Sequence, residues 1–337
     1  MPYSQRFILI VSSILQISLA VGLTGWLGLR RGEKAIAEVS QKLHNDLTEQ
    51  IQIRLFNFLA FSELANHLLL NTLQSKKSSQ IDRSFLEKTV IDNLQVLNAA
   101  SAIDALGYAS DRGDHIGAGR LEDGSFVIKI RQKGDLHIYS LDRSFKRKNL
   151  LAVRYNYDPR IRPWYQAAVK NKKKVWSPIY VTFSYAQVAI TLSEPAYDVN
   201  KQNVGVIASD ILLKDISKFL ANLRIGKTGK TFLIERSGKI VATSQSKTLP
   251  FDDDSKRHVR LLIENFDKTL TQKINLKTVQ KTNPIVIGTG SNQKFVQISP
   301  LKEDKGLDLL LITEFSKQEF SDIYQRNLNV RIQVKGD

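Results

Sequence analysis

The chain has 337 residues, of which 42% are hydrophobic and 24% are charged. This balance excludes a largely disordered protein and suffices for two folded domains plus some extended structure. Lysine and arginine total 49 against 33 acidic residues, a formal charge of +16, which favours anionic ligands, a membrane surface or nucleic acid as partners. The sequence contains no cysteine, so disulfides, thiolate nucleophiles and cysteine-based metal sites are excluded.

An uncharged apolar segment occupies residues 7–29 near the N-terminus. As a helix, these 23 residues would extend about 34 Å, enough to cross a bilayer. Trp26 lies near one end, and Arg30 and Arg31 terminate the segment, as is typical at a membrane boundary. We therefore predict a transmembrane helix over this segment, with a cleaved signal peptide as the alternative. The flanking basic residues do not fix its orientation.

The region that follows has the pattern of one long amphipathic helix over residues 32–75. Apolar residues recur every four or five positions, and residues 33–75 contain neither proline nor glycine, so the pattern predicts a continuous helix about 60 Å long. Such a helix would form a spine beside more than one domain. The alternative is two helices broken near Asn57.

The next part of the chain, residues 80–217, has the pattern of a sheet module. Short β-prone runs alternate with the turn sequences DRGD and EDGS between residues 102 and 141, which predicts an antiparallel meander. A helix is expected at residues 162–170, followed by further strands up to Asp210.

A second sheet module is predicted over residues 222–315. From residue 225 the same combination of short strands, turns and one charged helix returns, the helix being expected near residues 255–270. The fold class is therefore α+β. Residues 316–337 are expected to form a return helix toward a second membrane span that this sequence does not contain.

The sequence carries no convincing catalytic or metal-binding motif. The GKTGKT segment lacks the upstream glycine of a phosphate-binding loop, and the five histidines show no metal-ligand spacing. We therefore predict no enzyme activity, no metal and no cofactor. Residues 143–174 contain 11 basic residues and one acid, with interleaved aromatics. Nucleic-acid binding is nevertheless disfavoured, because a domain held outside the membrane would meet no DNA.

The segment YNYDPRIRPWYQAA, residues 155–168, combines residue types that recognise a small zwitterion. Arg162 is able to hold a carboxylate through two hydrogen bonds. Trp164 and Tyr165 could wall a small pocket, and Asp210 at the end of a later strand could balance a cation. Structural roles remain the alternative for each residue: a helix cap, a local ion pair and a core tryptophan.

This segment, the WSPIY sequence at residues 176–180, GVIASD and IGKTGKTFLIERSGKIVATS together resemble the double Cache sensor domains of bacterial transmembrane receptors. The resemblance is strongest over residues 155–244 and points to cyanobacterial histidine kinases and adenylate cyclases. It implies an extracytoplasmic sensor at the inner membrane. Its expected architecture is α+β, with an N-terminal transmembrane helix, a long spine helix and two PAS-like antiparallel-sheet modules in tandem, the membrane-distal one binding ligand.

The resemblance also implies roles for individual residues. In amino-acid-binding members, the RxWY residues hold the ligand carboxylate, whereas a Tyr-x-Asp motif and a later aspartate hold its ammonium group. Position 182 is threonine where the family has aspartate, which removes a bond of about 1.5–3 kcal/mol and leaves a small organic acid as an alternative ligand. The candidate ligand-binding residues are Arg162, Trp164, Tyr165, Tyr180, Thr182, Asp210 and Tyr139.

The expected function is small-molecule sensing, with ligand displacing the return helix relative to the spine helix. A homodimer through the N-terminal helix is expected from its apolar stripe. The alternative from another class is a periplasmic protein-interaction module without a small ligand. A preformed hollow between Tyr139, Trp164, Tyr180 and Asp210 would favour sensing, and a packed core there would favour interaction.

Overall fold

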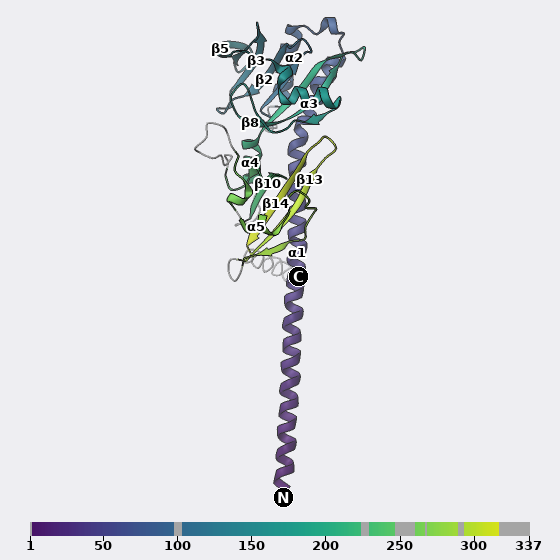
Figure 1. Cartoon of the computed structure of the whole chain (residues 1–337), viewed down its shortest axis with the longest axis vertical. Coiled ribbons are helices and arrows are strands. Elements are labelled where there is room, and N and C mark those ends of the chain that lie inside the picture. Colours follow the sequence, from purple (N-terminus) through teal and green to yellow (C-terminus); the bar gives the residue numbers. More distant parts are fainter. Residues whose placement is uncertain are drawn as a thin grey trace, which may run out of the picture.

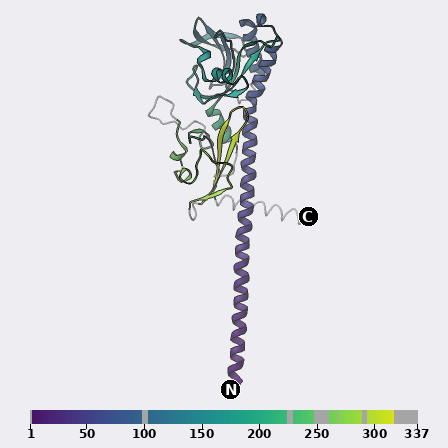
Figure 2. The ribbon, with the colours of Figure 1, turned by 45° about the vertical axis from the view of Figure 1, so that its right-hand side comes forward.

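The computed structural model describes residues 2–97, 103–223, 229–246, 260–266, 268–288 and 293–316. A single helix, α1 (Pro2–Gln74), includes both the predicted membrane segment and the predicted spine. It forms a stem that runs past both sheets in the two views (Figure 1, Figure 2). The helix is continuous at Asn57, so the alternative of a break there is wrong. Among the described residues, no helix combines the length and apolar character that a membrane span requires.

The far end of α1 supports the larger sheet. A 3₁₀ turn η1 (Ser78–Gln80) and helix α2 (Arg83–Leu97) follow α1, and α3 (Pro163–Asn171) is preceded by a 3₁₀ turn, η3 (Pro159–Ile161). Within the described residues the sheet has nine strands in the order β5-β4-β3-β2-β1-β9-β8-β6, with β7 paired to β8. These strands are β1 (Ala105–Ala109), β2 (His115–Arg120), β3 (Phe126–Gln132), β4 (Asp135–Leu141), β5 (Arg147–Arg154), β6 (Val175–Trp176), β7 (Tyr180–Val181), β8 (Val188–Tyr197) and β9 (Asn203–Leu212).

The smaller sheet lies beside the middle of α1 (Figure 1). Helix α4 (Leu213–Asn222) leads toward it directly from β9, and η4 (Ile263–Asn265) and α5 (Lys268–Lys273) accompany it. In the described part of the chain it has five antiparallel strands in the order β11-β10-β14-β13-β12. They are β10 (Lys230–Glu235), β11 (Ile240–Thr243), β12 (Ile285–Ile287), β13 (Lys294–Lys302) and β14 (Asp308–Ser316).

The two sheets share α1 as a packing partner. Near its C-terminal end, Ala65, Leu69 and Leu73 pack with α2 against one face of the large sheet. Lower on the stem, Leu55 and Leu59 belong to a cluster that includes residues of α4 and the small sheet. One face of the large sheet is thus covered by α1 and α2, whereas α3 packs on part of the opposite face.

These observations confirm an α+β fold built on antiparallel sheets. The helix predicted at residues 162–170 is confirmed as α3, and the strands of both blocks are present. Helix α4 was not predicted. Part of the helix expected near residues 255–270 and the return helix at 317–337 lie outside the described residues.

Candidate functional site

The open face of the large sheet has a floor of small residues. Strand register places Ala208, Gly107, Gly117 and Lys129 side by side across β9, β1, β2 and β3. Because paired residues project to the same face of a sheet, the first three leave free space above the strands. A methyl group on Gly117 would lie 3.3 Å from Nε2 of His115, so even this small addition would reduce the space.

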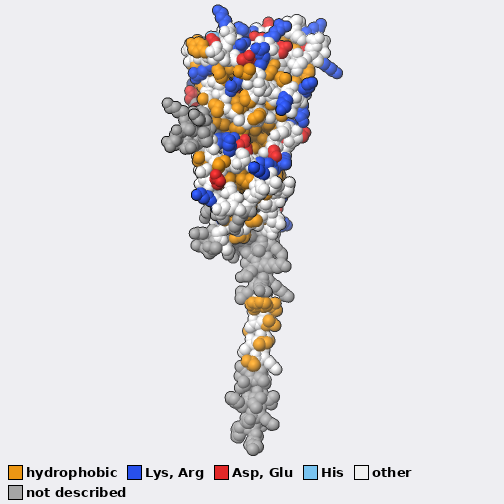
Figure 3. Space-filling view, viewed as in Figure 1, with side chains coloured by type: hydrophobic (Ala, Val, Ile, Leu, Met, Phe, Trp, Pro, Cys, Tyr) orange, Lys and Arg blue, Asp and Glu red, His pale blue; other side chains and the backbone are white. Residues whose placement is uncertain are grey.

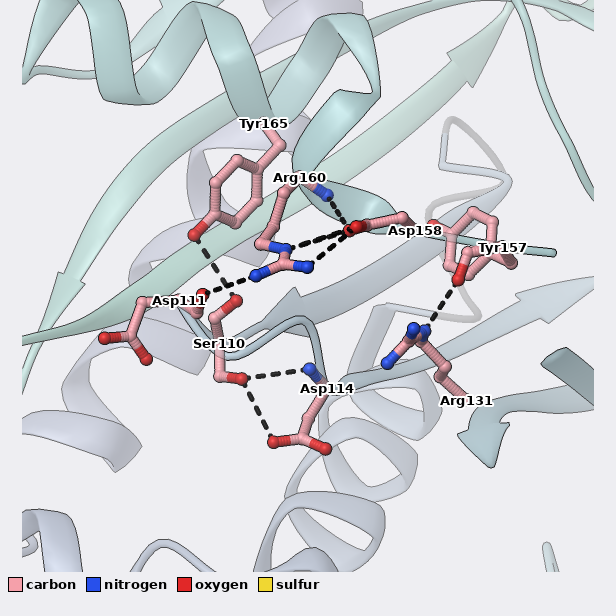
Figure 4. Close-up of polar contacts among 8 residues, drawn as sticks. All are labelled: Ser110, Asp111, Asp114, Arg131, Tyr157, Asp158, Arg160 and Tyr165. Atoms are coloured by element: carbon pink, nitrogen blue, oxygen red, sulfur yellow. Dashed lines mark hydrogen bonds and ion pairs between the residues drawn. The ribbon is translucent and has the colours of Figure 1, made fainter. Parts of the chain in front are cut away.

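The segment between β5 and α3 covers this floor and is held in place by two arginines (Figure 4). Arg160 binds both carboxylate oxygens of Asp158, and its Nη1 donates to the carbonyl of Asp111 at 3.4 Å. Asp158 also accepts from the backbone amide of Arg160 at 2.9 Å and begins the 3₁₀ turn η3. Arg131 donates from Nε to the carbonyl of Tyr157 at 2.6 Å. The DPR sequence therefore fixes the backbone immediately before Arg162.

Arg162 is the residue that precedes α3, and its side chain extends toward β7. Its Nη2 donates to the carbonyl of Val181 at 2.8 Å. The guanidinium lies over the rings of Tyr180 and Phe183, at 5.7 and 5.6 Å from their centres. Stacking on aromatic faces holds the planar cation without using most of its donors, so the remaining N–H groups stay available for an anion.

Asp210 sits on the floor and is oriented by a chain of hydroxyl groups. The Thr191 hydroxyl donates to its Oδ1 at 2.7 Å and lies 2.8 Å from the Tyr180 hydroxyl. Because Thr191 uses its proton on Asp210, Tyr180 donates to Thr191. Burial raises the pKa of Asp210, whereas Lys129, the Thr191 bond and Arg162 oppose the rise. Burial therefore disfavours the ionised form of Asp210, and a nearby positive charge stabilises that form.

These elements enclose a cavity of about 50 Å³, which is room for about four water molecules. Its floor includes Ala105, Gly107, Gly117 and Ala208. Its aromatic wall consists of Tyr157, Trp164, Tyr180 and Phe183. Its polar groups are His115, Lys129, Arg162, Thr182, Ser184 and Asp210.

Five of the seven candidate residues therefore meet in one cavity, namely Arg162, Trp164, Tyr180, Thr182 and Asp210. Tyr165 lies apart from its lining, because its hydroxyl donates to the carbonyl of Ser110 at 3.3 Å in the β1–β2 loop (Figure 4). Tyr139 pairs with Ile128 and packs with the cluster on the helix-covered face. A hollow is present, but Tyr139 does not border it.

Thr182 occupies the position at which the double Cache resemblance predicts an aspartate. Its amide donates to the carbonyl of Gln187 at 2.7 Å, and its hydroxyl accepts from the Gln187 amide at 3.1 Å. The side chain thus closes a turn while it lines the cavity. A neutral hydroxyl in this position would bind an ammonium group more weakly than a carboxylate would.

Sequence reasoning missed three polar groups of the cavity, Lys129, His115 and Ser184. Lys129 is buried, with 7% of its surface exposed. Burial, with help from Lys129, lowers the pKa of His115 to about 3, so its imidazole is neutral at physiological pH. The alternation of FVIKIRQ places Lys129 on the opposite face from Ile128 and Ile130, but it does not show that this face is covered.

Comparison with known proteins identifies the fold. Residues 121–218 match a family model described as methyl-accepting chemotaxis protein-like, first PDC sensor domain. The sensory domain of the Campylobacter jejuni chemoreceptor Tlp3, solved with isoleucine bound, superposes with a TM-score of 0.55 over 86% of this chain and 97% of that one, at 16% identity. The chain has the double Cache fold of chemoreceptor sensor domains.

A second solved structure and two sequence relatives are also similar to this chain. The ligand-binding domain of the Pseudomonas aeruginosa chemoreceptor PctC, solved with GABA, superposes with a TM-score of 0.53 at 16% identity, covering 82% of this chain and 99% of that one. In sequence, the chain is 28% identical over 160 residues to the methyl-accepting chemotaxis protein PctB of the same species, and 26% identical over 151 residues to adenylate cyclase 1 of Rhizobium meliloti. Each match spans 45% of this chain but only 22% of the relative.

The described residues offer no cluster of three or more histidine, aspartate or glutamate side chains arranged to hold a metal ion. The cavity lining offers charged and aromatic side chains. It combines two cations, one carboxylate and aromatic walls.

Proposed function

We propose that this chain is an extracytoplasmic sensor that binds a small carboxylate ligand, either an amino acid or a related organic acid, in the cavity of the large sheet module. The observation that carries the proposal is the convergence of Arg162 and Asp210 on one small, aromatic-walled cavity. Arg162 would hold the ligand carboxylate. Trp164 and Tyr180 would enclose its apolar part. The structural neighbours Tlp3 and PctC, solved with isoleucine and with GABA, support this class of ligand.

We also propose that residues 7–29 anchor the chain in the inner membrane. Support comes from the uncharged sequence and from the apolar side chains on the described stretch of the stem (Figure 3), where Ile17 and Leu19 are 64% and 71% exposed. Burial of such side chains in lipid removes their contact with water. The sheet modules would then lie on the extracytoplasmic side, and two copies would associate through the N-terminal helix.

The proposed role is binding without catalysis, because the cavity lacks a nucleophile paired with a base. Ligand binding would shift the population of conformations at the junction between the two modules and α1. The output would then come from another region or partner, as the short match to the longer relatives suggests.

The test is a thermal-shift and calorimetric screen of the purified chain in detergent against amino acids and small carboxylates. A ligand at 100 times its Kd adds about 2.7 kcal/mol to the unfolding free energy, so a hit raises Tm clearly. Arg162→Ala should abolish the shift while leaving the ligand-free Tm nearly unchanged.

Arg143→Ala is the control, since this exposed arginine lies in the turn between β4 and β5 and does not line the cavity. It should retain binding within a few-fold. Full affinity in Arg162→Ala would refute the site. If no compound shifts the Tm of the wild type, the hypothesis of a protein-interaction module without a small ligand is favoured over the sensor hypothesis.

A further inference from the structure

Lys129 is a buried lysine that lines the same cavity as Arg162 and Asp210. Lys129 lies in the centre of β3, between Ile128 and Ile130, and only 7% of its surface is exposed. The two isoleucines project to the helix-covered face, so Lys129 projects to the cavity. A buried ammonium group is costly unless negative charge is close by, and this requirement restricts what the cavity holds.

The strand register shows where the ammonium group lies. Asp210, Ala105 and Gly119 form one row across β9, β1 and β2. The Lys129 Nζ would lie 3.4 Å from a methyl group built on Gly119, so it leans over this row. It also lies 5.4 Å from the ring centre of Tyr185. Gly119 has no side chain and Ala105 has only a methyl group, so space remains between the ammonium group and Asp210.

The ammonium group of Lys129 interacts electrostatically with two carboxylates, Asp104 and Asp210. Lys129 is the strongest of the charges that lower their pKa values against the effect of burial. Among the ion pairs of the described residues, none closer than 4.0 Å joins Lys129 to either carboxylate. The ammonium group of Lys129 is therefore near Asp210 but does not form a direct ion pair with it.

The charges of the cavity lining now favour one class of ligand. Within the lining, Arg162 and Lys129 contribute two positive charges and Asp210 one negative charge. Asp104, on which Lys129 also acts, lies outside this lining. A carboxylate without an amino group neutralises the remaining positive charge. A zwitterionic amino acid would leave that charge unbalanced and place a second ammonium group near Lys129, which costs energy through like-charge repulsion.

We propose that Lys129 supplies the positive charge that balances Asp210, so that the cavity takes a small carboxylate that lacks an amino group. This inference rests on the proposed function and narrows its ligand class. The small cavity volume, about 50 Å³, favours a ligand with few heavy atoms. Thr182 is consistent with the same class, since a ligand without an ammonium group does not need a second aspartate.

The test compares matched ligand pairs by isothermal titration calorimetry on the purified chain. The pairs are acetate with glycine and propionate with L-alanine, and succinate is added as a dicarboxylate. In the wild type, the acid of each pair should bind at least 10-fold more tightly than the amino acid. In Lys129→Met, which keeps the length of the side chain and removes its charge, this preference should fall at least fivefold, because Asp210 becomes available to an ammonium group.

Each outcome decides between the alternatives. Tighter binding of the amino acids or of succinate by the wild type overturns the inference but leaves the proposed function intact. Equal losses for acid and amino acid in Lys129→Met also overturn it. If no compound of either pair binds and the broader screen is also empty, the proposed function itself fails. The wild-type comparison decides the matter even if the variant does not fold.

Discussion

Lys305, at the tip of the β13–β14 hairpin, donates from its ammonium group to Glu63 of α1 at 2.6 Å. Its carbonyl accepts from the backbone amide of Trp176 in β6 at 2.9 Å. The indole of Trp176 in turn donates to Glu303 of the same hairpin. The small sheet module therefore contacts the large one and the stem helix at the same place, on the side of the large module that carries α3.

The first prediction concerns this junction. Lys305 and Glu63 are partly exposed, at 22% and 36% of their side-chain surface, so solvent screens their attraction. A double-mutant cycle with Lys305→Met and Glu63→Gln should give a coupling energy of about 0.5–1 kcal/mol, measured by urea unfolding. A coupling near zero would mean that the backbone bond to Trp176, and not the ion pair, holds the junction.

The second prediction concerns a buried polar seam between α1 and the small sheet. Gln297 accepts from Thr48 at 3.0 Å and donates to Asn45 at 2.6 Å and to the carbonyl of Thr282 at 3.1 Å. Each buried group left without a partner costs about 1–3 kcal/mol, so Gln297→Leu should lose more than about 2 kcal/mol of unfolding free energy. The exposed Gln166→Leu serves as control and should change it by less than about 0.5 kcal/mol. Similar losses in both variants would contradict the role of the seam.

The third prediction concerns pH. Burial raises the pKa of Asp104 from 3.8 to about 6, so the folded state binds a proton more tightly than the unfolded state does. The carboxyl group therefore destabilises the fold progressively as pH rises from about 4 to 6. Relative to wild type, Asp104→Asn should gain stability over this range, measured by urea unfolding at pH 4.5, 5.5 and 7. His44 and His115 are present in both proteins, so their effects cancel. A relative loss on raising the pH would show that Lys129 holds Asp104 ionised.

The fourth prediction concerns the floor of the cavity. A methyl group on Gly117 would lie 3.3 Å from both the His115 Nε2 and the Leu106 carbonyl, where small shifts suffice to accommodate it. Gly117→Ala should therefore fold but weaken ligand binding at least 10-fold, because it occupies cavity space. Calorimetry measures the affinity, and ligand-free Tm reports the fold. Unchanged affinity would place the ligand elsewhere.

Much of the cavity was predictable because its residues belong to one contiguous motif. Arg162 and Trp164 are two positions apart, and the rigid DPR turn fixes both relative to the sheet. Lys129 was not recognised, because a lysine that alternates with isoleucines in a strand usually faces solvent. Here the corresponding face lies under the β5–α3 segment, a long-range arrangement that strand periodicity does not report.

Two other differences have local causes. Helix α4 follows β9 without an intervening turn, since Leu212 ends the strand and Leu213 begins the helix. No glycine or proline marks that change, so the run of apolar residues was read as strand alone. Tyr139 was expected at the cavity, but the regular β3–β4 pairing places it opposite Ile128, on the helix-covered face.

The unbroken course of α1 from residue 2 to 74 has a mechanical consequence. At 1.5 Å per residue, Glu63 lies about 84 Å along the helix axis from residue 7. A helix without a proline or a break has no cause for a sharp kink, so a change of its tilt is carried to its N-terminal end. A tilt of about 1° about Glu63 would displace that end by about 1.5 Å. A small change of tilt where α1 packs against the two modules would therefore become a displacement of side-chain size at the opposite end of the molecule.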